Sequence, residues 1–191
     1  NIRAGELLLE AARGSIGASG ETADLEVSIA SGGLFTGRAE DSVYLTSIAA
    51  DLSVDTIYAK QSVTLRTELG GSILDGYATD EENIDTVDLY LYSDADIGSA
   101  ANRLDLNQAA AGRLTVEAAG NIHLSELSGD MNIAGVASTA GDVDLVAAMS
   151  ILGRPGDFLA DVTGNSISLH AIGGSIGAPA GEDLNIDSAR W

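Results

Sequence analysis

Short segments in which apolar and polar residues alternate recur along the whole chain. In each segment two Leu, Ile, Val or Met residues flank one other residue, and Gly, Asn, Asp and Ser are frequent between segments. Alternation over three to five residues predicts a β-strand, and the intervening residue types favour turns. Neighbouring segments are mostly nine to twelve residues apart. We therefore predict many short strands, at residues 25–27, 43–45, 52–54, 63–65, 104–106, 114–116, 122–124, 131–133, 143–145, 167–169 and 184–186.

A longer repeat contains these segments. Residues 43–65 align with residues 122–145, with one inserted residue in the second copy, and every apolar position matches. Residues 25–27 align in the same way with 104–106, and these with 184–186. The chain therefore holds about two and a third copies of a unit of about 80 residues, at approximately 7–86, 87–166 and, in part, 167–191. A second marker, Ser/Asp-Ile-Gly or Ser-Ile-Leu, recurs at Ile16, Ile73, Ile97, Ile151 and Ile176.

The repeat predicts an all-β fold, a right-handed parallel β-helix with about 20 residues per coil. One unit cannot bury an apolar face alone, whereas stacked coils place their aliphatic residues on one another. Handedness follows the general preference of parallel crossovers. Roughly four coils per unit give nine or ten coils and a rod on the order of 45 Å long. Antiparallel β-sandwiches are the alternative, but aromatic residues make up only 4% of the chain and no linker separates the copies.

The chain starts and stops inside the repeat pattern. Neither end shows an amphipathic helix or a polar cap, which solenoids need for solubility. We therefore expect residues 1–191 to form a single β-solenoid segment of a longer repeat array.

Charge and motif content limit the classes of function. Asp and Glu number 29 against 9 Lys and Arg, a net charge of −20 that opposes binding to nucleic acid or anionic lipid. No apolar run is long enough for membrane insertion, and the absence of cysteine excludes disulfides and thiolate metal sites. Motifs of nucleophilic, zinc-dependent and phosphate-binding enzymes are absent. We predict a protein that is not an enzyme, with no catalytic, cofactor-binding or metal-ligating residue and no cofactor.

Residues 14–27, 118–153 and 166–186 resemble the repeats of large bacterial surface proteins of the filamentous-haemagglutinin type. In those repeats the pattern AGDVxLxAxxSI is followed by GxxxxxLxI. The resemblance implies a structural shaft segment of an exported adhesin or fibre protein at the bacterial cell surface. Its partners would be neighbouring repeats of the same chain or fibre, with cell-surface glycans bound through regions outside this segment. The alternative is a β-helix carbohydrate-active enzyme, a polysaccharide lyase or glycosidase.

Titratable side chains are the candidates for that alternative. His123 and His170 fall at or beside outward strand positions, so we expect both to be exposed and without a role in metal binding or proton transfer. Carboxylates that are close in sequence suit glycoside chemistry, but acidic turns supply such pairs freely and Trp191 is the only tryptophan. The pairs are Asp94 with Asp96, Asp142 with Asp144, and Asp157 with Asp161.

An acidic stretch spans residues 68–96. It contains nine Asp and Glu residues, and no Lys or Arg lies between Arg66 and Arg103. Weak calcium binding is one interpretation, and a solvated acidic loop is the other, because neither the EF-hand spacing nor the calcium-binding nonapeptide is present. Residues 74–86 and 152–161 are predicted to bulge out as loops.

Tyrosines are the remaining candidates for a surface role. Tyr44, Tyr58, Tyr90 and Tyr92 are predicted to point outward. They would form a contact patch for a partner, or pair across neighbouring coils and add modestly to stability.

Overall fold

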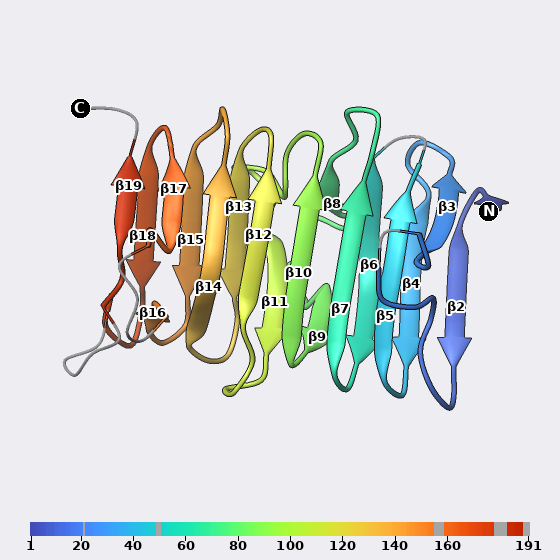
Figure 1. Ribbon diagram of the computed structural model, residues 1–191, viewed down its shortest axis with the longest axis horizontal. Helices are drawn as coiled ribbons and strands as arrows, with labels where there is room; N and C mark the ends of the chain where they lie inside the picture. Colours follow the sequence, from blue (N-terminus) through green and yellow to red (C-terminus); the bar gives the residue numbers. More distant parts are fainter. Residues whose placement is uncertain (21, 49–50, 155–158, 178–182, 189–191) are drawn as a thin grey trace.

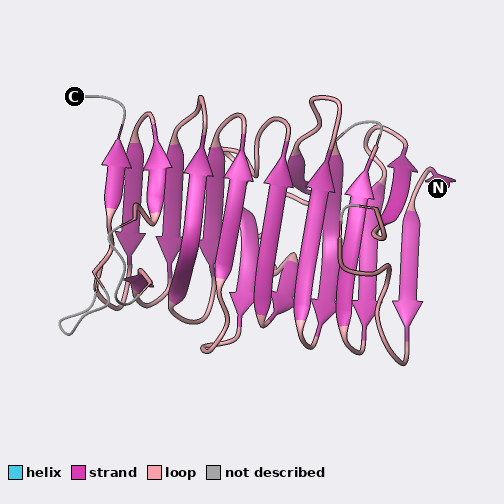
Figure 2. Ribbon diagram, viewed as in Figure 1, coloured by secondary structure: helices cyan, strands magenta, loops and turns pink. Residues whose placement is uncertain are grey.

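The computed structural model describes residues 1–20, 22–48, 51–154, 159–177 and 183–188. These residues form two β-sheets and no helix (Figures 1 and 2). Consequently, no helix that could cross a membrane occurs in the described part of the chain. All described strand pairs are parallel, which confirms the β-solenoid and excludes the antiparallel sandwich.

The first sheet, sheet A, has ten strands. Nine follow one another as coil succeeds coil, and β16 pairs only with β14. The strands are β1 (Ile2–Ala4), β3 (Leu25–Ile29), β5 (Ser42–Ser47), β7 (Ser62–Thr67), β10 (Asp88–Ser93), β12 (Leu114–Ala118), β14 (Met131–Ser138), β16 (Ile151–Leu152), β17 (Val162–Gly164) and β19 (Ile186–Ser188).

The second sheet, sheet B, has nine strands and lies behind sheet A in Figure 1. Eight follow one another in coil order, and β8 pairs only with β6. The strands are β2 (Leu7–Ala11), β4 (Leu34–Ala39), β6 (Leu52–Ala59), β8 (Ile73–Asp75), β9 (Ile84–Thr86), β11 (Leu104–Gln108), β13 (Ile122–Glu126), β15 (Val143–Ala147) and β18 (Ile167–Ala171).

The chain winds between the two sheets in about eight turns, spaced about 22 residues apart. Near strands run upward, far strands run downward and the chain advances from right to left, so the coil is right-handed, as predicted (Figure 1). Coil length varies. Fewer residues separate Val43 from its partner Val63 than separate Val63 from its next partner, Leu89. The predicted coil length therefore fits only the shorter coils, and the prediction of nine or ten coils is too high.

Aliphatic side chains fill the space between the sheets. In sheet A, Leu45, Leu65, Leu91 and Val116 lie one above another in register, and each is 0% exposed. Sheet B supplies an equivalent row. Burial of a side chain of this size stabilises the fold by roughly 1.5–3 kcal/mol, so these rows hold successive coils together.

The Ser/Asp-Ile-Gly marker forms a third row at the turns. The marker residues Ile73 and Ile97 are joined by an isolated parallel bridge, Ile97 is joined in the same way to Ile122 at the start of β13, and all three are fully buried. The glycine that follows the isoleucine has a positive φ, 69° at Gly17 and 62° at Gly98. Only glycine adopts this conformation without strain, so the Ile-Gly form of the marker encodes a turn, whereas the Ser-Ile-Leu forms lie in the short strands β8 and β16.

Polar side chains join neighbouring coils at the turns. Asp96 Oδ1 accepts a hydrogen bond of 2.5 Å from the Asn121 backbone N–H, and Asn121 Oδ1 accepts one of 3.0 Å from the Asp142 N–H. Asp142 Oδ1 continues the series by accepting from the Ser166 N–H at 3.0 Å. Side-chain oxygens of one coil accept hydrogen bonds from backbone N–H groups at the turns of the next coil, which explains the frequent Asp and Asn between strand segments.

The offset of the long repeat relates opposite sheets. β5, β7, β10 and β12 are successive neighbours in sheet A, three coils in all, and β13 follows half a coil later in sheet B. The unit therefore spans three and a half coils, so Val43 in sheet A corresponds to Ile122 in sheet B. The prediction of four coils per unit is wrong. Strands of both sheets have the same alternating pattern, so the pattern does not indicate to which sheet a strand belongs.

Candidate functional site

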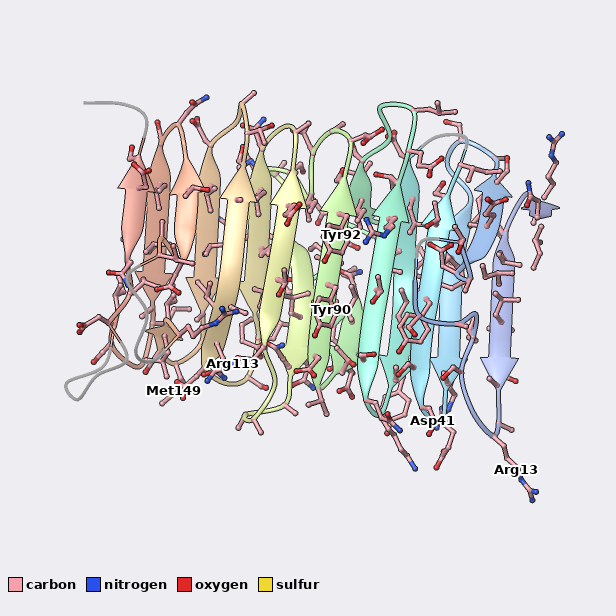
Figure 3. All side chains as sticks on the ribbon, viewed as in Figure 1. Arg13, Asp41, Tyr90, Tyr92, Arg113 and Met149 are labelled. Atoms are coloured by element: carbon pink, nitrogen blue, oxygen red, sulfur yellow. The ribbon has the colours of Figure 1, made fainter. Side chains whose placement is uncertain are left out.

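The outer face of sheet A carries three of the five tyrosines. Tyr44 on β5 and Tyr90 on β10 lie in register on either side of Thr64 on β7. One row along, Tyr92 lies beside Arg66, whose guanidinium carbon is 3.9 Å from the centre of the tyrosine ring. Tyr90 and Tyr92 lie on the near face of the molecule, on β10 (Figure 3).

Two hollows follow this row of side chains. One of about 380 Å³ is lined by Tyr44, Thr64 and Tyr90, and another of about 420 Å³ by Thr46, Glu68 and Glu117. Arg66 and Tyr92 border both hollows, so the two lie next to each other along the sheet. We call this surface the tyrosine groove and define it by Asp24, Tyr44, Thr64, Arg66, Asp88, Tyr90 and Tyr92.

Hydrogen bonds fix the carboxylates of the tyrosine groove. Asp24 accepts a hydrogen bond from the Thr46 hydroxyl, and Asp88 Oδ1 accepts one of 3.0 Å from the Arg113 backbone N–H. Partial burial raises the pKa of Tyr90, and the charge of Asp88 raises it further. The phenol therefore stays protonated at neutral pH and can donate a hydrogen bond.

A charged row crosses the outer face of sheet B at the corresponding position. We define it by Arg103, His123, Asp144 and Ser168. Arg103 pairs with Asp144, and His123 Nδ1 lies 3.5 Å from the same carboxylate. Burial raises the pKa of Asp144, but hydrogen bonding and the positive charge of Arg103 outweigh it and lower the pKa below its ordinary value. Asp144 is therefore ionised at neutral pH.

A carboxylate cluster, Asp75, Asp80 and Asp105, adjoins the charged row. Asp105 is only 6% exposed, and burial together with the negative charges of Asp75 and Asp80 raises its pKa to about 6. Asn83 Nδ2 donates to Asp75 Oδ1 at 2.8 Å, and Asn83 Oδ1 accepts from the Asp105 N–H at 2.9 Å. A hollow of about 220 Å³ opens beside the cluster and includes Arg103 in its lining. A carboxyl group with this pKa in a hollow has the properties of a proton donor or acceptor near neutral pH.

The tyrosine groove and the charged row are equivalent positions of the repeat. Asp24, Tyr44, Thr64 and Tyr90 follow one another across sheet A, as Arg103, His123, Asp144 and Ser168 do across sheet B. Corresponding members lie one repeat unit apart in the sequence. The buried side chains of the two copies are alike, whereas their outer faces carry different chemistry.

The two histidines differ in their surroundings. His170 is exposed, as predicted, but the side chain of His123 is only 15% exposed because it lies against Asp144. The predicted exposure of His123 is therefore wrong, since the strand alternation gives the outward direction but not the neighbour that covers the ring. That neither histidine takes part in metal binding or proton transfer stays a prediction.

The described carboxylates of the predicted pairs have separate partners. Asp142 accepts a hydrogen bond from the Ser166 N–H, whereas Asp144 pairs with Arg103. Asp94 Oδ2 accepts from the Gly70 N–H at 3.4 Å, whereas Asp96 accepts from the Asn121 N–H. Asp161 is 2% exposed and accepts hydrogen bonds from backbone N–H groups, and Asp157 lies outside the described residues.

The predicted loops and the acidic stretch lie mostly within the described residues. The first loop is residues 76–83, because the ends of the predicted 74–86 belong to β8 and β9. The second, 152–161, includes residues 155–158, which the structure does not describe. Acidic residues of the stretch 68–96 are spread over both sheets, and no group of three or more His, Asp or Glu side chains within the described ranges is arranged to hold a metal ion. The calcium role stays a prediction.

The tyrosines divide between the two sheets. Tyr44, Tyr90 and Tyr92 gather on sheet A, whereas Tyr58 lies on sheet B, where the Arg38 guanidinium carbon is 5.3 Å from its ring centre. The coil path, which local alternation does not encode, decides this division.

Sequence reasoning missed the buried Asp105. Residues of the segment 76–83 lie beside it, because Asn83 Oδ1 accepts a hydrogen bond from the Asp105 N–H and Asp80 lines the same hollow.

Comparison with protein-family models, with curated proteins and with solved structures gives no match.

Proposed function

We propose that the chain is a structural shaft segment of an exported bacterial cell-surface adhesin or fibre protein, and that it projects or assembles adhesive parts. The observation that carries this proposal is the uninterrupted parallel ladder. Sheet A runs from β1 to β19 and sheet B from β2 to β18, with aliphatic rows between them. Backbone hydrogen bonds and side-chain packing both run along the coil axis, as a rod under mechanical tension requires.

Surface charge supports the same role. The net charge of −20 repels other rods of the same kind and keeps an elongated protein soluble at high local density. The resemblance of residues 118–153 to repeats of the filamentous-haemagglutinin type adds a cellular location, the outside of a Gram-negative bacterium.

Antibody labelling tests the shaft proposal. An antibody against this segment is applied to intact source cells, and bound antibody is located by immunogold electron microscopy. We expect gold particles along thin surface fibres, and we expect protease treatment of intact cells to remove them. Labelling confined to lysed cells would contradict the proposal.

A second candidate function is a carbohydrate-active enzyme, and the carboxylate cluster is the observation that favours it. Asp105, with a pKa of about 6, is the group suited to act as a general acid, and Asp144 beside Arg103 is an ionised carboxylate in the same region. Release of reducing ends or unsaturated sugars from a polysaccharide panel tests this function. We expect activity, if this candidate holds, to be abolished by Asp105→Asn; a panel without any turnover contradicts it.

A further inference from the structure

We propose that the tyrosine groove binds a neutral oligosaccharide. The shaft role gives this segment only a mechanical task, whereas the groove gives it a ligand-binding surface of its own. The proposal rests on three features of the outer face of sheet A: the spacing of the tyrosines, the adjacency of the two hollows, and the charge and hydrogen-bonding capacity of the surrounding side chains.

The spacing of the tyrosines leaves room for a ring-shaped ligand. Tyr44 and Tyr90 stand two strands apart, which places their backbones about 10 Å from each other. The residue between them is Thr64, whose side chain is short, and all three residues line the same hollow, in which the Tyr44 side chain reaches β7 and places its hydroxyl 3.5 Å from the Ser62 hydroxyl. The C–H groups of a sugar ring are attracted to the electron-rich face of an aromatic ring. The hollow of about 380 Å³ is within the size range of small-molecule sites.

The adjacency of the two hollows favours a ligand longer than one sugar. Arg66 lies over Tyr92 at 3.9 Å, and together they form the boundary that both hollows share. The second hollow, of about 420 Å³, extends the groove toward Glu117. An oligosaccharide placed across several coils would contact Tyr44 and Tyr90 in the first hollow and Tyr92 at the boundary.

The polar side chains of the tyrosine groove can form hydrogen bonds with the hydroxyl groups of a sugar. Asp24 and Asp88 are fixed by contacts with Thr46 and the Arg113 backbone and retain lone pairs that accept hydrogen bonds from sugar hydroxyls. Thr64 and the protonated Tyr90 phenol add donors.

The charge of the groove selects against anionic ligands. Asp24, Asp88, Glu68, Asp94 and Glu117 line the two hollows, and Arg66 is the basic residue among the lining side chains. This excess of negative charge repels uronic acids, sulfated sugars and nucleotides. A neutral sugar chain is therefore the ligand class that the groove fits.

Titration with defined oligosaccharides tests the proposal. The probes are neutral oligomers of glucose, galactose, mannose and N-acetylglucosamine, screened by saturation-transfer NMR and quantified by isothermal titration calorimetry. We expect at least one of these probes to bind. Tyr90→Ala should then weaken binding by about fivefold to tenfold, because it removes one aromatic wall, whereas Tyr90→Phe should retain most of the affinity.

Tyr58→Ala is the matched control. Tyr58 also lies on an outer face and beside an arginine, but on sheet B, so its loss should change the affinity by less than about twofold. Circular dichroism of each variant establishes that the coil is intact.

Four results would each overturn the proposal. They are absence of binding by every neutral probe at about 10 mM, tighter binding of sulfated or uronic probes, equal losses in Tyr58→Ala and Tyr90→Ala, and concentration-dependent self-association that Tyr90→Ala abolishes. The last result would make the groove a contact between copies. None of these results bears on the immunogold test of the shaft role.

Discussion

Substitution of Gly98 by alanine is predicted to destabilise the coil through two separable effects. Gly98 has a φ of +62°, which costs an L-residue about 1–2 kcal/mol. An added Cβ would also lie 2.2 Å from the carbonyl oxygen of His123 and 2.9 Å from the backbone nitrogen of Leu104. Backbone atoms cannot rotate away as a side chain can, so relief requires neighbouring coils to shift, at about 1–3 kcal/mol. After the smaller conformational freedom of the unfolded alanine chain is included, Gly98→Ala should lower the free energy of unfolding by about 2–4 kcal/mol.

Two other glycines separate these effects. Gly70 has a φ of +79° but no heavy atom within 4 Å of the position that a Cβ would take, so Gly70→Ala should cost only about 0.5–1 kcal/mol. Gly129 has neither a positive φ nor a close neighbour, so Gly129→Ala should be neutral or stabilising by up to about 1 kcal/mol.

Urea denaturation followed by far-ultraviolet circular dichroism and by hydrogen exchange gives the three free energies. The two probes must agree, because a stack of coils can lose its cooperativity. If Gly98→Ala is no more destabilising than Gly70→Ala, then the contact between the turn and the next coil is not rigid, and our explanation of the Ile-Gly marker fails.

Three further predictions test other parts of the structure. Asp105 has a pKa of about 6 against an ordinary value of 3.8, so the folded protein loses stability as the pH rises from about 4 to 6. Asp105→Asn should lack this loss and have a free energy of unfolding higher by on the order of 2 kcal/mol above pH 6, measured by urea titration across pH. Equal pH profiles of the two proteins would contradict the burial of a charged carboxyl. Leu69 is 80% exposed with a φ of +56°, so Leu69→Asn should raise the unfolding free energy by about 0.5–1 kcal/mol, and a lower melting temperature would refute this. Asn121→Ala removes the acceptor for the Asp142 N–H and should cost about 1–2 kcal/mol in chemical denaturation, with exchange at that amide accelerated; unchanged exchange would show that the contact is dispensable.

The repeated part of the fold is the part that the sequence predicts well. Leu45 and Leu65 stand above one another because every coil places an aliphatic residue at the same inward position, and a pattern repeated in each coil is readable from one chain. Outward residues have no such repetition. Tyr44 and Tyr58 both look outward in sequence, but only the coil path decides that Tyr44 joins Tyr90 on one sheet and Tyr58 faces the opposite side.

The candidate sites depended on contacts that no local pattern encodes. Asp105 occupies an outward strand position and would be exposed on alternation alone. The segment 76–83, which connects β8 to β9, lies beside it, because Asn83 Oδ1 accepts from the Asp105 N–H and Asp80 lines the same hollow. The raised pKa of Asp105 also depends on Asp75 and Asp80, which belong to the preceding coil and lie far from it in the sequence.

The half-coil in the repeat unit has a geometric consequence for any protein assembled from such units. A unit of whole coils would place corresponding outward residues of every copy on the same side of the rod. A unit of three and a half coils turns each successive copy to the opposite side, as Tyr44 in sheet A and His123 in sheet B illustrate. A shaft of this design would present the outer faces of successive units in two opposed directions, and two units that both carried a binding surface there would engage two partners at once.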